Sequence, residues 1–155
     1  MHPFSAIRPP KLAISLGFIG LVPFITGSLG IWVTPEAWRE RVLEELLTYA
    51  AIVMAFMGAI HWGLAMRAEE SSEKAPIQLG LSVIPPLLGW LGLSLPVHFA
   101  VPIFLIAFGT LYYADIWAVK QGLAPVWYPA LRKPLSIVVV IFLLIAWLAT
   151  VTPLL

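Results

Sequence analysis

The feature that most constrains this chain is a series of five apolar segments, each long enough to cross a lipid bilayer. They cover residues 12–32, 46–66, 77–95, 99–119 and 135–153. A transmembrane helix needs roughly 20 mainly apolar residues. These runs are continuous rather than alternating, which favours helices over a β-barrel. The sequence therefore predicts an all-α fold, a polytopic membrane protein whose single domain, residues 1–155, is a bundle of five transmembrane helices.

Composition excludes most soluble functions. Hydrophobic residues make up 61% of the chain and charged residues 11%, whereas soluble domains carry about 25% charged residues. The net charge of +1 offers no footprint for binding nucleic acid. The sequence has no cysteine, which excludes disulfides, thiolate metal sites and iron–sulfur clusters. We therefore expect no metal and no cofactor, and the lipid bilayer is the partner that the composition requires.

Proline and small residues predict how the spans pack. Pro85 and Pro86 predict a kink in the third span, and Pro23 and Pro102 predict milder ones. Membrane helices tolerate proline where neighbours satisfy the freed carbonyls. The second span carries a small residue at every fourth position, and small residues let helices approach closely. This stripe predicts a packing seam and a central helix; it consists of Ala51, Ala55, Ala59 and Gly63.

The basic residues predict the orientation, because cytoplasmic loops are enriched in Lys and Arg. With the N-terminus inside, the outer side carries only Arg39 and Arg41. The cytoplasmic side then carries Arg8, Lys11, Arg67, Lys74, Lys120, Arg132 and Lys133. We expect a cytoplasmic N-terminus and a periplasmic C-terminus. The first apolar run is too long for an ordinary signal-peptide core, so an uncleaved first helix is expected.

Two polar loops each allow a structural and a functional interpretation. Thr34 is suited to cap a helix whose first position is Pro35. Residues 37–45 are then a solvated lead-in turn, with an outer docking surface as the alternative. Residues 67–76 are interpreted as a connector. Cation binding is the alternative, although the carboxylates there lack the ligand spacing of a calcium loop.

The segment 120–134 is not an ordinary hydrophilic loop. Gly122 is suited to end the fourth helix. Trp127 and Tyr128 are typical of anchors in the lipid headgroup layer, and Arg132 is placed to meet lipid phosphates. The sequence predicts a connector that follows the membrane surface. The alternative is a re-entrant flap that closes a cytoplasmic-side cavity.

Two ionisable residues inside the spans are the main functional candidates, because such groups are costly in a membrane. His61 lies about 9 Å and Asp115 about 7.5 Å inside the cytoplasmic end of their helices, at 1.5 Å per residue. A pair between them would satisfy both groups. The alternatives are a purely structural clasp, or an ion pair of Asp115 with Lys120, Arg132 or Lys133.

Other polar and aromatic residues are expected at this depth. The candidate ligand-binding residues are His61, Asp115, Tyr112, Trp62, Gln78, Ser82, Trp127, Tyr128 and Arg132. No nucleophile with an oxyanion motif accompanies them, so no catalytic residue is assigned and an enzyme is not favoured.

Three patches resemble a family of small membrane proteins. They read LGFIGLVPF at 16–24, AIHWG at 59–63 and GLAPVWYPALR at 122–132. In order along nearly the whole chain, they are similar to the transmembrane protein 69-like family, also called domain of unknown function 3429. The resemblance implies a small polytopic fold without an assigned activity. The short start without a transit peptide resembles the bacterial members, so the bacterial inner membrane is the expected location.

A second resemblance, to the tryptophan-rich sensory protein family, rests on the seven Trp residues and a similar five-helix length. The His-Trp-Gly and Trp-Tyr patches fit that family poorly.

Two functions remain open at this point. One is a non-enzymatic packing, assembly or accessory component that contacts a membrane-protein partner or forms a homo-oligomer. Short loops and the lack of a catalytic constellation favour it. The other is binding of a lipid, a quinone or a proton-coupled solute in a cytoplasmic-leaflet cavity near His61 and Asp115. Their shared depth favours the second, because pure packing does not require paired ionisable groups.

Overall fold

The computed structural model describes residues 8–67 and 73–152, apart from the side chain of Thr150. All regular secondary structure in these ranges is helical. The helices are α1 (Lys11–Ile19), α2 (Val22–Val33), α3 (Glu36–Ala65), α4 (Ala75–Leu93), α5 (Val97–Lys120) and α6 (Tyr128–Val151). With α1 and α2 forming one segment, five segments are long and apolar enough to cross a membrane. The predicted all-α fold with five spans is confirmed.

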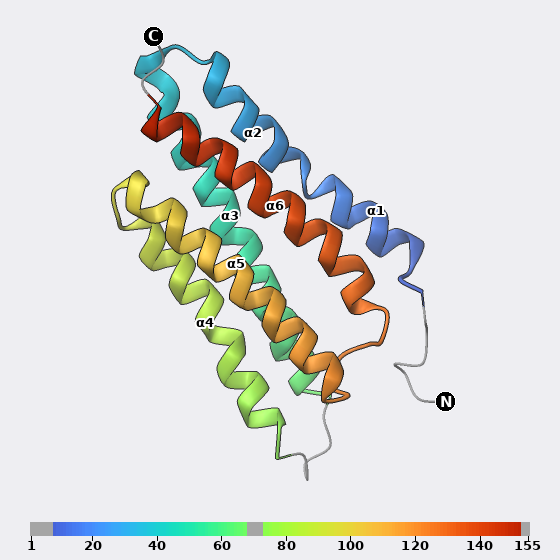
Figure 1. Cartoon of the computed structure of the whole chain (residues 1–155). Helices are drawn as coiled ribbons and strands as arrows, with labels where there is room; N and C mark the ends of the chain where they lie inside the picture. The colour runs from blue at the N-terminus through green and yellow to red at the C-terminus, as the bar shows by residue number, and fades with distance from the viewer. Residues whose placement is uncertain (1–7, 68–72, 153–155) are drawn as a thin grey trace.

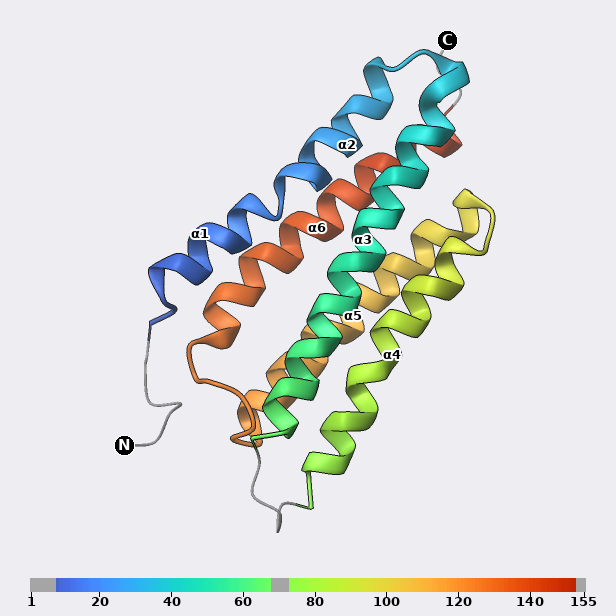
Figure 2. The same cartoon turned by 180° about the vertical axis from the view of Figure 1, so that it is seen from behind.

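The helices form an elongated bundle (Figure 1). Helix α3 packs against α2, α4 and α5, and α6 packs against α1, α2 and α5. Seen from behind, α1 and α2 border one side of the bundle and α4 the other (Figure 2). One end of the bundle holds the first residues of α1, α4 and α6 and the last residues of α3 and α5 (Figure 1). We call it the N-terminal end. The C-terminal end carries the α2–α3 turn and the end of α6.

Large apolar side chains fill the core and also cover the outside. Phe24 and Phe108 are buried and meet edge to face, with ring centroids 6.0 Å apart. On the outer surface, Phe56, Trp90 and Ile106 are each more than 60% exposed. Exposed apolar side chains on every long helix are what a bundle surrounded by lipid tails requires.

The first span contains a break rather than the mild kink expected at Pro23. Helix α1 ends at Ile19 and α2 begins at Val22. Proline at the second position of α2 has no N–H to continue the hydrogen-bond ladder from α1. The hydroxyl of Tyr49 in α3 donates to the Gly20 carbonyl at 2.9 Å, so the neighbouring helix satisfies a backbone acceptor at the break.

The second span begins ten residues earlier than its apolar run. Residues 37–45, expected as a lead-in turn, belong to the continuous 30-residue helix α3. The capping prediction is wrong: Pro35 is the N-cap, and the Thr34 hydroxyl instead donates to the Gly30 carbonyl at 2.7 Å, which closes α2. Arg41 pairs with Glu45 across one exposed helical turn.

The segment 120–134 is mostly helix. Gly122, with φ +74°, ends α5 in a Schellman turn in which the Leu123 N–H donates to the Ala118 carbonyl at 2.8 Å. Helix α6 then begins at Tyr128, with Pro129 in its first turn, where a missing N–H is harmless. The expectations of a surface-following connector and of a re-entrant flap are therefore wrong for residues 128–134.

Helices α3 and α4 approach closely at Gly58, which the predicted stripe did not include. A Cβ on Gly58 would collide with the Ser82 carbonyl. Pro86 lacks the N–H that would bind this carbonyl within α4. Ala51 does contact Gly89, but Ala59 and Gly63 are exposed. A four-residue repeat drifts by about 40° per step around a 3.6-residue helix, so the stripe turns out of the interface.

Candidate functional site

The site is built around a carboxylate that two other helices hold in the bundle interior. His61 on α3 and Asp115 on α5 are both buried, and His61 Nε2 lies 3.1 Å from Asp115 Oδ1. Arg132, in the second turn of α6, donates from Nε to Asp115 Oδ2 at 2.6 Å and is 5% exposed. The His61 pairing and one of the alternative ion pairs thus occur together, whereas Lys120 and Lys133 are exposed.

This arrangement balances charge inside the membrane. A buried carboxylate is stable only with partners that replace its hydration. Asp115 and Arg132 cancel each other, so the cluster is neutral when the imidazole is neutral. A carboxylate only accepts hydrogen bonds, so the neutral ring donates from Nε2 and keeps an unprotonated Nδ1. No described atom binds His61 Nδ1 or Arg132 Nη2, so both remain available.

Tyr128 joins this cluster from the first turn of α6. It is 6% exposed, and its hydroxyl interacts electrostatically with Asp115 and Arg132. Its ring packs edge-on against Trp127 at 6.0 Å and contacts buried Ala118 and Ala124. The expectation that Tyr128 anchors at the lipid headgroups is therefore wrong. The early start of α6 turns this side chain into the bundle.

A cavity of about 690 Å³ opens beside the cluster, between α1, α3 and α6. Arg132, Tyr128 and Ser136 line it on the α6 side. Most of the remaining wall is apolar and includes Ala13, Leu16, Gly17, Ile52, Val53, Phe56 and Ile60. His61 and Asp115 are not in this wall, so Arg132 is the member of the charged cluster that reaches the cavity.

The nine candidate residues separate into three groups. His61, Asp115, Arg132 and Tyr128 form the cluster, and Trp127 lines the adjoining cavity. Gln78 and Ser82 are buried on α4 and lie outside the cavity wall. Trp62 is 48% exposed and Tyr112 partly exposed, and neither lines the cavity.

Sequence reasoning missed Ser136 and the small residues of α1 in the wall. Ser136 lies one helical turn after Arg132, so an i, i+4 search from the buried arginine would have found it. Gly17 has no side chain that could bind a ligand, and its role is to let α1 lie close to α6. A Cβ at this position would lie 2.8 Å from Leu135 Cδ1. No polar signal marks such a position.

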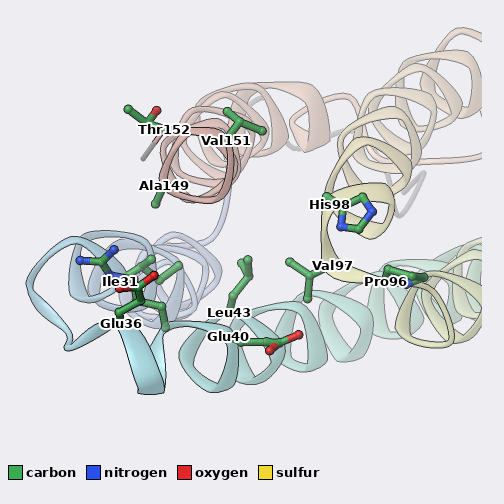
Figure 3. Close-up of a pocket in the computed structure, with 11 residues that line it drawn as sticks. Ile31, Glu36, Glu40, Leu43, Pro96, Val97, His98, Ala149, Val151 and Thr152 are labelled. Atoms are coloured by element: carbon green, nitrogen blue, oxygen red, sulfur yellow. The ribbon is translucent and has the colours of Figure 1, made fainter. Parts of the chain in front are cut away.

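A second cavity, of about 600 Å³, lies at the C-terminal end of the bundle. Leu43 from α3, Val97 from α5 and Ala149 from α6 surround it, and Glu40 and His98 lie at its edge (Figure 3). Glu40 and His98 are exposed, as is Glu36, and Arg39 in the same wall is partly exposed. Within residues 8–67 and 73–152, no three His, Asp or Glu side chains are grouped to hold a metal ion.

The fold and the buried cluster define a polytopic, all-helical membrane protein with a His–Asp–Arg group between its spans. The chain belongs to the family described as "Protein of unknown function (DUF3429)", which matches residues 9–148. This confirms the first resemblance, and the matched range includes most of all six helices.

Two curated relatives carry the name "Transmembrane protein 69". The protein from Xenopus tropicalis is 29% identical over 133 residues, covering 84% of this chain and 51% of that protein. The protein from Mus musculus is 26% identical over 125 residues, covering 79% of this chain and 50% of that protein. The chain thus spans about half the length of these relatives. No solved structure matches it.

Proposed function

We propose that this protein is a non-enzymatic membrane component that binds an amphiphilic small molecule in the cavity between α1, α3 and α6. The observation that carries the proposal is the Arg132 guanidinium. Its Nε is held by Asp115, while its buried Nη2 has no partner and the residue lines the cavity. A buried, unpaired donor of this kind is stabilised by an acceptor on a ligand.

The cavity has the size and lining of a small-molecule site. Such sites usually enclose about 300–1,000 Å³ and combine a mainly apolar wall with a few polar groups that orient the ligand. Arg132, Tyr128 and Ser136 provide the polar groups at one side. The ligand class is therefore an apolar chain with an acceptor head, such as the carbonyl of a lipid ester or quinone, or a phosphate.

Access from the bilayer supports a lipid-soluble ligand. Leu16 on α1 and Ile52 and Phe56 on α3 line the cavity and are each more than half exposed on the outer surface of the bundle. A molecule could therefore enter sideways from the membrane without crossing an aqueous phase.

The proposal is tested by mass spectrometry of amphiphiles that stay bound after gentle extraction. Val53→Trp places a large ring in the cavity wall without touching the charged cluster, and Arg132→Gln removes the charged guanidinium. We expect both variants to lose the molecule retained by the wild type. Tandem spectra then distinguish ester lipids, phospholipids and quinones.

Matched controls separate binding from general disturbance. Val83→Trp makes the same change on the exposed face of α4, and Lys133→Gln removes an exposed charge next to Arg132. Both controls should retain the molecule. The proposal is wrong if the wild type retains no specific amphiphile, or if Val53→Trp retains as much as Val83→Trp.

The second candidate is an assembly or accessory role with a membrane-protein partner or a second copy. It is favoured by the exposed small residues Ala59 and Gly63 on α3, where a Cβ on Gly63 would meet no atom within 4 Å. Small exposed positions allow close approach of another helix. Gly63→Leu should then abolish cross-linked oligomers or partner complexes in native membranes, and unchanged complexes would contradict this role.

We further propose the bacterial inner membrane as the location, with the N-terminus in the cytoplasm. The excess of Lys and Arg at the N-terminal end of the bundle supports this orientation. The cavity and the charged cluster would then lie in the cytoplasmic leaflet.

A further inference from the structure

Gln78 on α4 is a buried polar residue that neither the cavity nor the cluster explains. Its side chain is completely buried, and no described atom binds its Oε1 or its Nε2. Buried amides in native proteins are almost always hydrogen-bonded, often to an internal water molecule. Leaving one unpaired costs about 1–3 kcal/mol.

Helix register places Gln78 level with His61. Gly58 lies against Ser82 and Ala51 against Gly89, so α3 and α4 run antiparallel with His61 opposite Leu79. Gln78 is therefore about one residue, or roughly 1.5 Å along the axis, from the level of His61. Since both side chains are fully buried, both lie inside the bundle at the same depth.

The register between α4 and α5 agrees with this placement. Gly92 lies against Phe104, and Lys74 Nζ donates to Gln121 Oε1 at 2.6 Å. These contacts put Gln78 opposite Ala118, one helical turn from Asp115 towards the N-terminal end. Gln78 is thus buried on α4 within about one helical turn of the level at which His61 meets Asp115.

The two residues have complementary hydrogen-bonding groups. With Nε2 committed to Asp115, His61 offers the lone pair of Nδ1. Gln78 offers one acceptor and two donors. Among the described residues, His61 pairs with Asp115 from α5, and the other oxygen of Asp115 binds Arg132 from α6, whereas α4 contributes this uncharged amide.

We propose that Gln78 and His61 Nδ1 together bind an internal water molecule, and that this water gives His61 access to protons from the N-terminal end of the bundle. Gln78 lies one turn along α4 from Lys74, which donates to Gln121 at this end of the bundle. Nδ1 takes a proton from the water, and the solvent at this end returns one to it.

Gln78 lies on α4, which contributes no residue to the wall of the ligand cavity. Gln78 acts as a positioning residue for the water and so for the imidazole. The polar line consists of Gln78, His61, Asp115 and Arg132, and it runs from α4 to the cavity wall.

Solid-state NMR on protein in lipid bilayers tests the water directly. Histidine labelled with ¹⁵N in a His2→Gln, His98→Gln background reports on His61 alone. In the wild-type site, magnetisation should pass from water to the Nδ1 side of the ring. Gln78→Leu and the longer, unbranched Gln78→Met should abolish this transfer while the Nε2 contact with Asp115 remains.

Gln121→Leu is the matched control, because it removes a glutamine amide at the end of the bundle and leaves Gln78 in place. The transfer to His61 should persist in it. Absence of transfer in the parent protein, or equal transfer in Gln78→Met, would overturn the proposal. A higher unfolding temperature for either Gln78 variant would do so as well, since it would mean that the amide has no partner to lose.

Discussion

Asp115 is the residue on which the buried cluster depends, because its carboxylate accepts hydrogen bonds from two other helices. Oδ1 faces His61 on α3, and Oδ2 faces Arg132 on α6. Removing this one charge leaves the guanidinium of Arg132 buried without a counter-ion, whereas removing His61 leaves the ion pair intact. The two substitutions should therefore differ in their effect on stability.

We expect Asp115→Asn to lower the free energy of unfolding by about 3–5 kcal/mol, the usual effect of breaking a buried ion pair. His61→Asn should have a smaller effect. Reversible unfolding in mixed micelles measures both values. Equal losses for the two variants, or a loss below about 1 kcal/mol for Asp115→Asn, would show that the Asp115–Arg132 bond contributes little to stability.

At the scale of the helices, the contact between α3 and α4 depends on two residues acting together. Pro86 frees the Ser82 carbonyl from the ladder of α4, and Gly58 has no side chain to keep that carbonyl away. The close crossing brings Gln78 to the level of His61. The register of the site therefore follows from a glycine and a proline rather than from polar contacts.

Gly58→Ala should destabilise the bundle by about 1–3 kcal/mol through overpacking against α4. Gly63→Ala is the matched control on the same helix, since its Cβ would enter open space. Helix propensity favours alanine there by up to about 1 kcal/mol. We therefore expect Gly58→Ala to lower the free energy of unfolding and Gly63→Ala to raise it. An unchanged free energy of unfolding for Gly58→Ala would contradict the close contact between α3 and α4.

The sequence predicted the number of spans better than their ends. Hydropathy marks the stretch of a helix in contact with lipid, so all five segments were found. It does not mark where a helix begins, which is why the exposed start of α3 and the first seven residues of α6 were missed. In α6, Arg132 lowers the local hydropathy although it is buried against Asp115.

The only part of the candidate site that could be predicted from the sequence was the depth of each residue along its helix. The rise of 1.5 Å per residue was enough to place His61 and Asp115 at one level. Which basic residue pairs with Asp115 depends on the rotation of α6 about its own axis, which the sequence does not give. The cavity wall depends on where α1 lies relative to α3 and α6, so small and apolar residues such as Gly17 gave no signal.

For the whole molecule, the two ends of the bundle differ in the number of Lys and Arg residues, and the proposed orientation rests on this difference. Because the sequence has no cysteine, a single introduced cysteine is the only thiol that a maleimide can label. Its labelling therefore shows on which side of the membrane that residue lies. With a membrane-impermeant maleimide on intact cells, Ser94→Cys at the α4–α5 turn should react at once. Gln121→Cys should react only after permeabilisation, and the reverse pattern would place the cavity in the outer leaflet.

A density map of the protein extracted with its native lipid will show whether the cavity beside Arg132 holds an amphiphile. We predict elongated density between α1, α3 and α6, with its head within hydrogen-bond distance of Arg132 Nη2. A map in which the cavity is absent because α1 packs directly on α6 and α3, with Arg132 Nη2 bound by a protein group, would contradict the account.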